Sequence, residues 1–158
     1  MYMIYGSSSY IIELPPPDAT SGSLVFKGVL EKAPINMGLL SLFRTLAILR
    51  ELNELGMIHV TKRFRMVAEE LIPLCGYIIS NIHLYLNTLG ITIFKYVLDV
   101  YDLGEDEYSE VRPFIEIYVN VKSVDGMLDL WESTMRYLEE MLGDHVLAQV
   151  DIFFTRTG

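Results

Sequence analysis

Residues 114–122 alternate between apolar and polar side chains, and this pattern constrains the fold more than any other part of the sequence. Four β-branched residues hold the odd positions: Ile115, Ile117, Val119 and Val121. Polar or amphipathic residues hold the even ones: Glu116, Tyr118, Asn120 and Lys122. Successive side chains of a strand point to opposite faces of a sheet, so we expect one face of this strand in a core and the other toward water.

The segments around this strand extend the pattern. Residues 91–102 are rich in β-formers, and the acidic connection after them predicts an antiparallel hairpin with residues 114–122. A helix is expected to begin at Ser123 or Asp125 and to end at Gly143, and residues 146–155 alternate again as a closing strand. The helix carries one apolar stripe: Met127, Leu128, Trp131, Met135, Leu138 and Met141.

The N-terminal part mixes strand and helix signals. Residues 10–14 and 24–32 are predicted strands, separated by a loop that begins with three prolines. Residues 36–55 are a predicted helix ending at Gly56, followed by a short segment, 57–61, with weak strand character. A second helical stretch runs from about Lys62 to Leu89, is kinked or divided at Pro73, and closes at Gly90.

Together these segments predict a single α+β domain over residues 1–158 with the element order ββααββαβ. The hydrophobic fraction of 51% and the length of 158 residues suffice for a sizeable core. The simplest layered arrangement is one mostly antiparallel sheet with the helices packed on one face.

Compartment and membrane signals favour a cytoplasmic chain. Cys75 is the only cysteine, which rules out an intrachain disulfide and a thiolate zinc site. The N-terminus lacks the basic and apolar regions of a signal peptide. Residues 71–94 contain no Asp, Glu, Lys or Arg, but Pro73, Gly76 and Gly90 disfavour a membrane span, so we expect a buried core helix running into a strand.

The distribution of charged residues bears on whether the chain could bind nucleic acid. The net charge is −9, and residues 99–158 hold 14 of the 21 acidic residues but 4 of the 12 basic ones, a field that disfavours nucleic acid. Residues 43–65 nevertheless form a predicted helix, Gly56, an entering strand and a basic cluster of Lys62, Arg63 and Arg65. This stretch resembles the end of a winged helix, which implies phosphate contacts by the three basic residues and a weaker alternative function as a DNA-binding regulator.

The sequence contains no phosphate loop, dinucleotide fingerprint, nucleophile elbow or zinc-protease helix, so no cofactor and no metal site are predicted. The acidic connection between Asp102 and Glu110 leaves cation binding open, with a solvated hairpin tip as the simpler interpretation. An alternative reading is a small enzyme with a pocket between sheet and helices. In it His83 and a carboxylate such as Glu116 are the catalytic pair for proton transfer.

Tyrosine is abundant, with ten residues, and combines a broad ring with a polar tip. We take Tyr85, Tyr96 and Tyr118 as candidate ligand-binding residues, and expect Tyr96 and Tyr118 to share one face of neighbouring strands. The leading interpretation is a non-catalytic module that binds a small apolar or aromatic ligand, or that self-associates as a homo-oligomer, with a dimer the simplest case.

Overall fold

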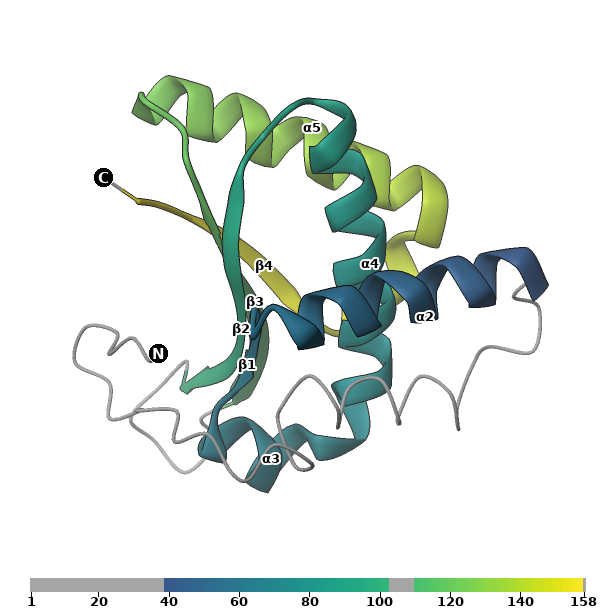
Figure 1. Ribbon diagram of the computed structural model, residues 1–158. Helices are drawn as coiled ribbons and strands as arrows, with labels where there is room; N and C mark the ends of the chain where they lie inside the picture. Colours follow the sequence, from purple (N-terminus) through teal and green to yellow (C-terminus); the bar gives the residue numbers. More distant parts are fainter. Residues whose placement is uncertain (1–38, 103–109, 158) are drawn as a thin grey trace.

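A computed structural model describes residues 39–102 and 110–157 of the chain (Figure 1). The predicted strands at 10–14 and 24–32 and most of the acidic connection lie outside these residues. The described elements are, in order, α2 (Leu39–Glu54), β1 (Ile58–Val60), α3 (Lys62–Ala68), a 3-10 turn (Glu69–Leu71), α4 (Ile72–Thr88), β2 (Ile93–Asp102), β3 (Val111–Val119), α5 (Val124–Leu142), α6 (Asp144–Leu147) and β4 (Asp151–Arg156).

The four strands form one mixed sheet in the order β1-β2-β3-β4. The β2–β3 hairpin is antiparallel, as predicted, but β1 pairs with β2 and β3 pairs with β4 in parallel. The expectation of a mostly antiparallel sheet was therefore wrong. The two parallel pairings follow from the connections. Helices cross over between β1 and β2 and again between β3 and β4, and such crossovers join parallel strands.

The predicted element order also needs correction in the described residues. Residues 58–60 form a full member of the sheet between the two helical segments, which the order ββααββαβ omitted. The helical stretch from Lys62 is divided, with Pro73 in the first turn of α4, where its missing N–H costs no hydrogen bond. The predicted last strand, 146–155, starts inside the short helix α6, and β4 begins only at Asp151.

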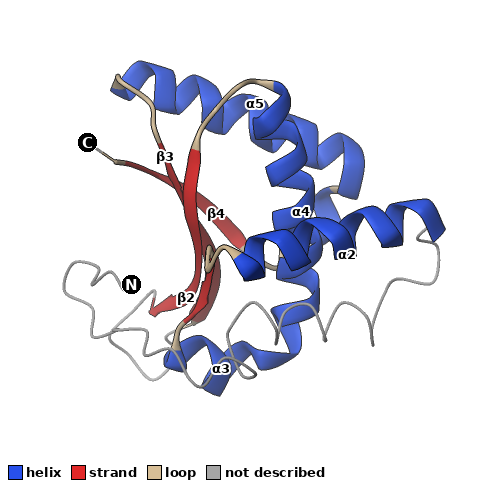
Figure 2. Ribbon diagram, viewed as in Figure 1, coloured by secondary structure: helices blue, strands red, loops and turns tan. Residues whose placement is uncertain are grey.

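The three long helices α2, α4 and α5 lie on one side of the sheet (Figures 1 and 2). Nine of the 17 residues of α4 are buried, which identifies it as the central core helix. It packs against the inward residues of the sheet, among them Tyr96, Leu98, Ile115 and Ile117. No helix among the described residues has the length and apolar character needed to span a bilayer.

Helix α5 forms most of the second crossover, between β3 and β4. The Ser123 hydroxyl caps it by accepting a 3.0 Å hydrogen bond from the Gly126 backbone N–H, and Gly143 ends it with φ +84°. Its buried residues are Leu130, Thr134 and Leu138. The predicted stripe was therefore partly misplaced, because Leu128, Trp131 and Met141 are exposed.

Candidate functional site

The face of the sheet opposite the long helices gathers most of the polar and aromatic side chains of the strands. We call it the outer face. Strand register sets its rows: Lys95 lies opposite Tyr118 and Thr155, and Val97 lies opposite Glu116 and Phe153. The next row is Asp99, Phe114 and Asp151, and the pair Tyr101 and Arg112 follows.

Three rings from three strands form an aromatic cluster on this face: Tyr101, Phe114 and Phe153. Their centroids are 5.4 to 6.0 Å apart, and the closest pair, Phe114 and Phe153, is edge-to-face. At these separations the rings contact one another and cannot enclose a ligand between them. They offer a platform instead, and Phe153 is 43% exposed.

Glu116 stands beside this platform. Its Oε2 accepts hydrogen bonds from the Tyr118 hydroxyl (2.7 Å) and the Thr155 hydroxyl (3.0 Å). Burial raises the pKa of the Glu116 carboxyl, while the Thr155 bond and the Lys95 charge oppose this shift. Together Tyr101, Phe114, Glu116, Phe153 and Thr155 line an open groove of about 450 Å³, which we call the aromatic groove.

Two further ionisable groups lie on the outer face: Lys95, one row from Glu116 on the side away from Phe114, and His59, in the row of Glu116 beyond Val97. Lys95 is only 8% exposed, and its Nζ lies 4.5 Å from the centroid of the Tyr118 ring. Burial lowers the pKa of Lys95 to about 8, although Glu116 opposes this shift. Burial, and then the Lys95 charge, lower the pKa of His59 to about 4. Charge on this part of the outer face is therefore costly.

The platform is anchored at its far end by Asp151. The Tyr101 hydroxyl donates to Asp151 Oδ2, and Arg112 Nη2 donates to Asp151 Oδ1 over 2.8 Å. The Arg112 guanidinium holds the pKa of Asp151 below its ordinary value. These bonds restrict the Tyr101 ring, so the platform is held before any ligand arrives.

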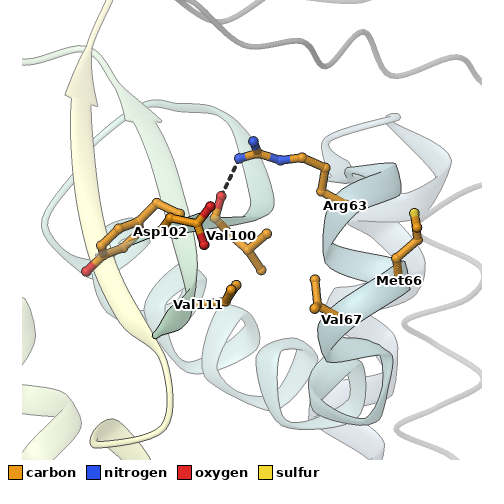
Figure 3. Close-up of a pocket in the computed structure, with 7 residues that line it drawn as sticks. Arg63, Met66, Val67, Val100, Asp102 and Val111 are labelled. Atoms are coloured by element: carbon orange, nitrogen blue, oxygen red, sulfur yellow. Dashed lines mark hydrogen bonds between the residues drawn. The ribbon is translucent and has the colours of Figure 1, made fainter. Parts of the chain in front are cut away.

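A second hollow, of about 300 Å³, lies between α3 and the end of the β2–β3 hairpin (Figure 3). Apolar side chains from both sides line it, including Met66 and Val67 on the helix and Val100 and Val111 on the strands. Arg63 stands at its rim and donates a hydrogen bond to the Val100 carbonyl. Asp102 also lines it, so its charged groups among the described residues are one guanidinium and one carboxylate.

The predicted catalytic pair is separated by the sheet. His83 Nδ1 lies 2.9 Å from the Tyr96 hydroxyl on the helix-covered face. Glu116 lies on the outer face, because its neighbours Ile115 and Ile117 point into the core. The structure therefore does not bring His83 and Glu116 together.

The three predicted ligand-binding tyrosines occupy three different places. Tyr85 stacks on Tyr137 between α4 and α5, with ring centroids 4.4 Å apart and an angle of 8° between the planes. Tyr96 is fully buried in the core, and Tyr118 is buried on the outer face. Tyr96 pairs with Ile117, and Tyr118 pairs with Lys95, so the expectation that Tyr96 and Tyr118 share a face was wrong.

Two further predictions concerned the basic cluster, as a phosphate contact, and the acidic connection, as a cation site. Lys62, Arg63 and Arg65 lie in the short helix α3 and not in a loop that could follow a phosphate backbone. Nε of Arg63 lies 3.6 Å from Oδ1 of Asp99. Within residues 39–102 and 110–157, no cluster of His, Cys, Asp and Glu could hold a metal ion. Most of the connection between Asp102 and Glu110 lies outside the described residues.

Of the residues singled out from the sequence, Glu116 lines the aromatic groove and Tyr118 donates a hydrogen bond to Glu116, but the groove itself was not predicted. Tyr101, Phe114, Phe153 and Thr155 come from three strands, and only the register places them together. The alternation around Glu116 was the one available signal, since it marked a polar face with Phe114 at its start. Comparison of the chain with family models, with curated proteins and with solved structures found no match.

Proposed function

We propose that this chain is a non-catalytic module that binds a small ligand with a flat aromatic or apolar body in the aromatic groove. One observation carries the proposal: three packed rings lie beside a half-buried carboxylate in an open hollow of about 450 Å³. Ligand sites typically combine such apolar walls with a small number of placed polar groups. The rings would contact the body of the ligand, and Glu116 would orient it.

The same geometry favours binding over proton-transfer catalysis. Among the described residues that line the aromatic groove Glu116 is the only carboxylate, and Tyr101 is already bonded to Asp151. An acid–base reaction generally needs a second group within reach of the same substrate. His83 does not supply it, because it lies on the other face and is bonded to Tyr96.

Trp131 provides a reporter for the test. It is the only tryptophan of the chain, and its Nε1 donates a 3.0 Å hydrogen bond to the Ile152 carbonyl, next to Phe153. We would titrate the protein with a panel of neutral and charged one-ring and two-ring aromatic compounds and follow Trp131 fluorescence. Ligands of the groove should change the emission and bind with a single saturable site.

Phe153→Ala removes one ring of the platform and should weaken binding roughly 5- to 30-fold. Phe94→Ala is the matched control, because Phe94 is a similarly exposed phenylalanine (49% against 43%) that does not line the groove. If no compound binds, or if both variants lose binding equally, the proposed groove is not the site.

Self-association stays a prediction. Val124, Leu128 and Trp131 expose apolar surface on one side of α5 with the spacing of neighbouring helix turns. Sedimentation velocity would measure the oligomeric state, and Leu128→Lys should dissociate an oligomer held by this surface. A monomer at all concentrations would remove this part of the interpretation.

A further inference from the structure

We infer that the ligand of the aromatic groove carries a protonated nitrogen, so that the chain selects organic cations such as amines and amidines. This inference rests on the proposed function, because it names the ligand class of the same groove. It is carried by the unused acceptor of Glu116 together with the ring faces beside it.

The hydrogen bonds of the groove leave one strong acceptor. Both protein donors, the hydroxyls of Tyr118 and Thr155, reach Glu116 Oε2. Among the described residues no donor reaches the other oxygen, Oε1. A carboxylate that is partly withdrawn from water gains from a further donor, so a ligand that offers an N–H group fits this position. A ligand carboxylate would instead place two anionic groups side by side.

A cation fits better than a neutral donor for electrostatic reasons. A charged N–H makes a shorter and stronger bond to a carboxylate than a neutral one does. The faces of Phe114 and Phe153 carry negative quadrupole charge, which attracts a cation placed over them. The net charge of −9 raises the local concentration of cations around the molecule.

Lys95 is the one cation near Glu116 on the described outer face, and its position leaves room for another. The register places Lys95 one row from Glu116 on the side of Tyr118 and Thr155, whereas Phe114 lies one row away on the opposite side. Lys95 does not line the aromatic groove. A ligand resting on the rings therefore approaches Glu116 from the side that Lys95 does not occupy.

Three probes of one ring and nearly equal size separate charge from shape: benzamidine is a cation, benzamide is neutral and benzoate is an anion. Isothermal titration of the full chain should show benzamidine binding at least tenfold more tightly than benzamide, and benzoate more weakly still. Glu116→Gln should weaken benzamidine binding roughly 10- to 100-fold, which is the value of a hydrogen bond to a charged group, and leave benzamide within about threefold.

Two variants serve as controls. Glu132→Gln makes the same change on an exposed position of α5 and should leave all three affinities unchanged. Glu116→Asp keeps the charge, so it should preserve the order benzamidine, benzamide, benzoate even if binding weakens. Because the amide oxygen of Gln can still accept from Tyr118 and Thr155, thermal melting should show Glu116→Gln folded.

The inference and the proposed function fail separately. Equal binding of the three probes, all lost on Phe153→Ala, would overturn the cation preference and leave the aromatic groove as a binding site. Benzamidine binding that Glu116→Gln does not weaken would also overturn the inference. Absence of any binding that depends on Phe153, for these probes and for the whole panel, would count against both.

Discussion

The hydroxyl of Thr61 donates a 2.8 Å hydrogen bond to Oδ1 of Asp99, which joins the start of α3 to the middle of β2. The same hydroxyl caps α3 by accepting from the backbone N–H of Phe64 at 3.1 Å. Asp99 is 1% exposed, and its Oδ1 also accepts from the Val100 N–H. One threonine therefore holds both the helix end and a buried carboxylate in the first crossover.

Thr61→Val should lower the free energy of unfolding by about 3 kcal/mol, because it removes a helix cap and one bond to a buried carboxylate. Thr61→Ser keeps the hydroxyl and should cost about 1 kcal/mol or less. Urea denaturation measures both. A valine variant as stable as the serine variant would show that this bond contributes nothing to folding.

The buried His59 side chain should make the folded protein less stable in mild acid. Burial, and then Lys95, lower its folded pKa to about 4, against an ordinary value of 6.5, and its Nδ1 is buried without a hydrogen bond in the described residues. Well above pH 6.5 His59 is neutral in both states. As the pH falls from 6.5 toward 4, the unfolded chain binds a proton that the folded chain does not, so up to about 3 kcal/mol of stability is lost.

His59→Gln should flatten the dependence of unfolding free energy on pH between 6.5 and 4, measured by urea denaturation at a series of pH values. His145→Gln, at an exposed position, should leave the slope as it is in the wild type. A slope that His59→Gln does not change would mean that His59 is protonated equally in both states.

A substitution of Tyr85 separates two roles for this residue: ligand binding, as predicted from the sequence, and packing between α4 and α5, as seen in the structure. Tyr85→Leu removes the stack on Tyr137 and should cost about 1 to 2 kcal/mol of stability by thermal denaturation. Benzamidine affinity should stay within twofold of the wild type, because Tyr85 does not line the aromatic groove. A large loss of affinity in a folded Tyr85→Leu protein would restore its role in binding.

Gly90 ends the helical part of the chain with φ +72°, and a Cβ there would meet no atom within 4 Å. Gly90→Ala should therefore cost about 1 kcal/mol from the backbone conformation alone. Gly90→Asn should cost less, because asparagine tolerates the left-handed region better than other residues do. Equal stability of all three proteins would show that this conformation is not maintained in solution.

Local secondary structure was predicted well where it depends on residues that are close together in the sequence. Gly56, Gly90 and Gly143 each end a helix with positive φ, and Ser123 caps α5. The β2–β3 hairpin is antiparallel, as its short connection predicted. The parallel pairings were missed because each depends on a helix crossing between strands that are far apart in sequence, and no local pattern reports which edge the returning strand will join.

The candidate site divides in the same way. A period of two placed Glu116 and Tyr118 on one face of one strand, since that follows from the geometry of a single extended chain. Whether Tyr96 lies beside Tyr118, and which ring lies beside Glu116, depends on register and strand order. Those are set by how α4 and α5 pack their buried faces against the sheet. The alternation of side chains was thus determined by the sequence alone, whereas the aromatic groove exists only because tertiary packing aligns Tyr101, Phe114 and Phe153.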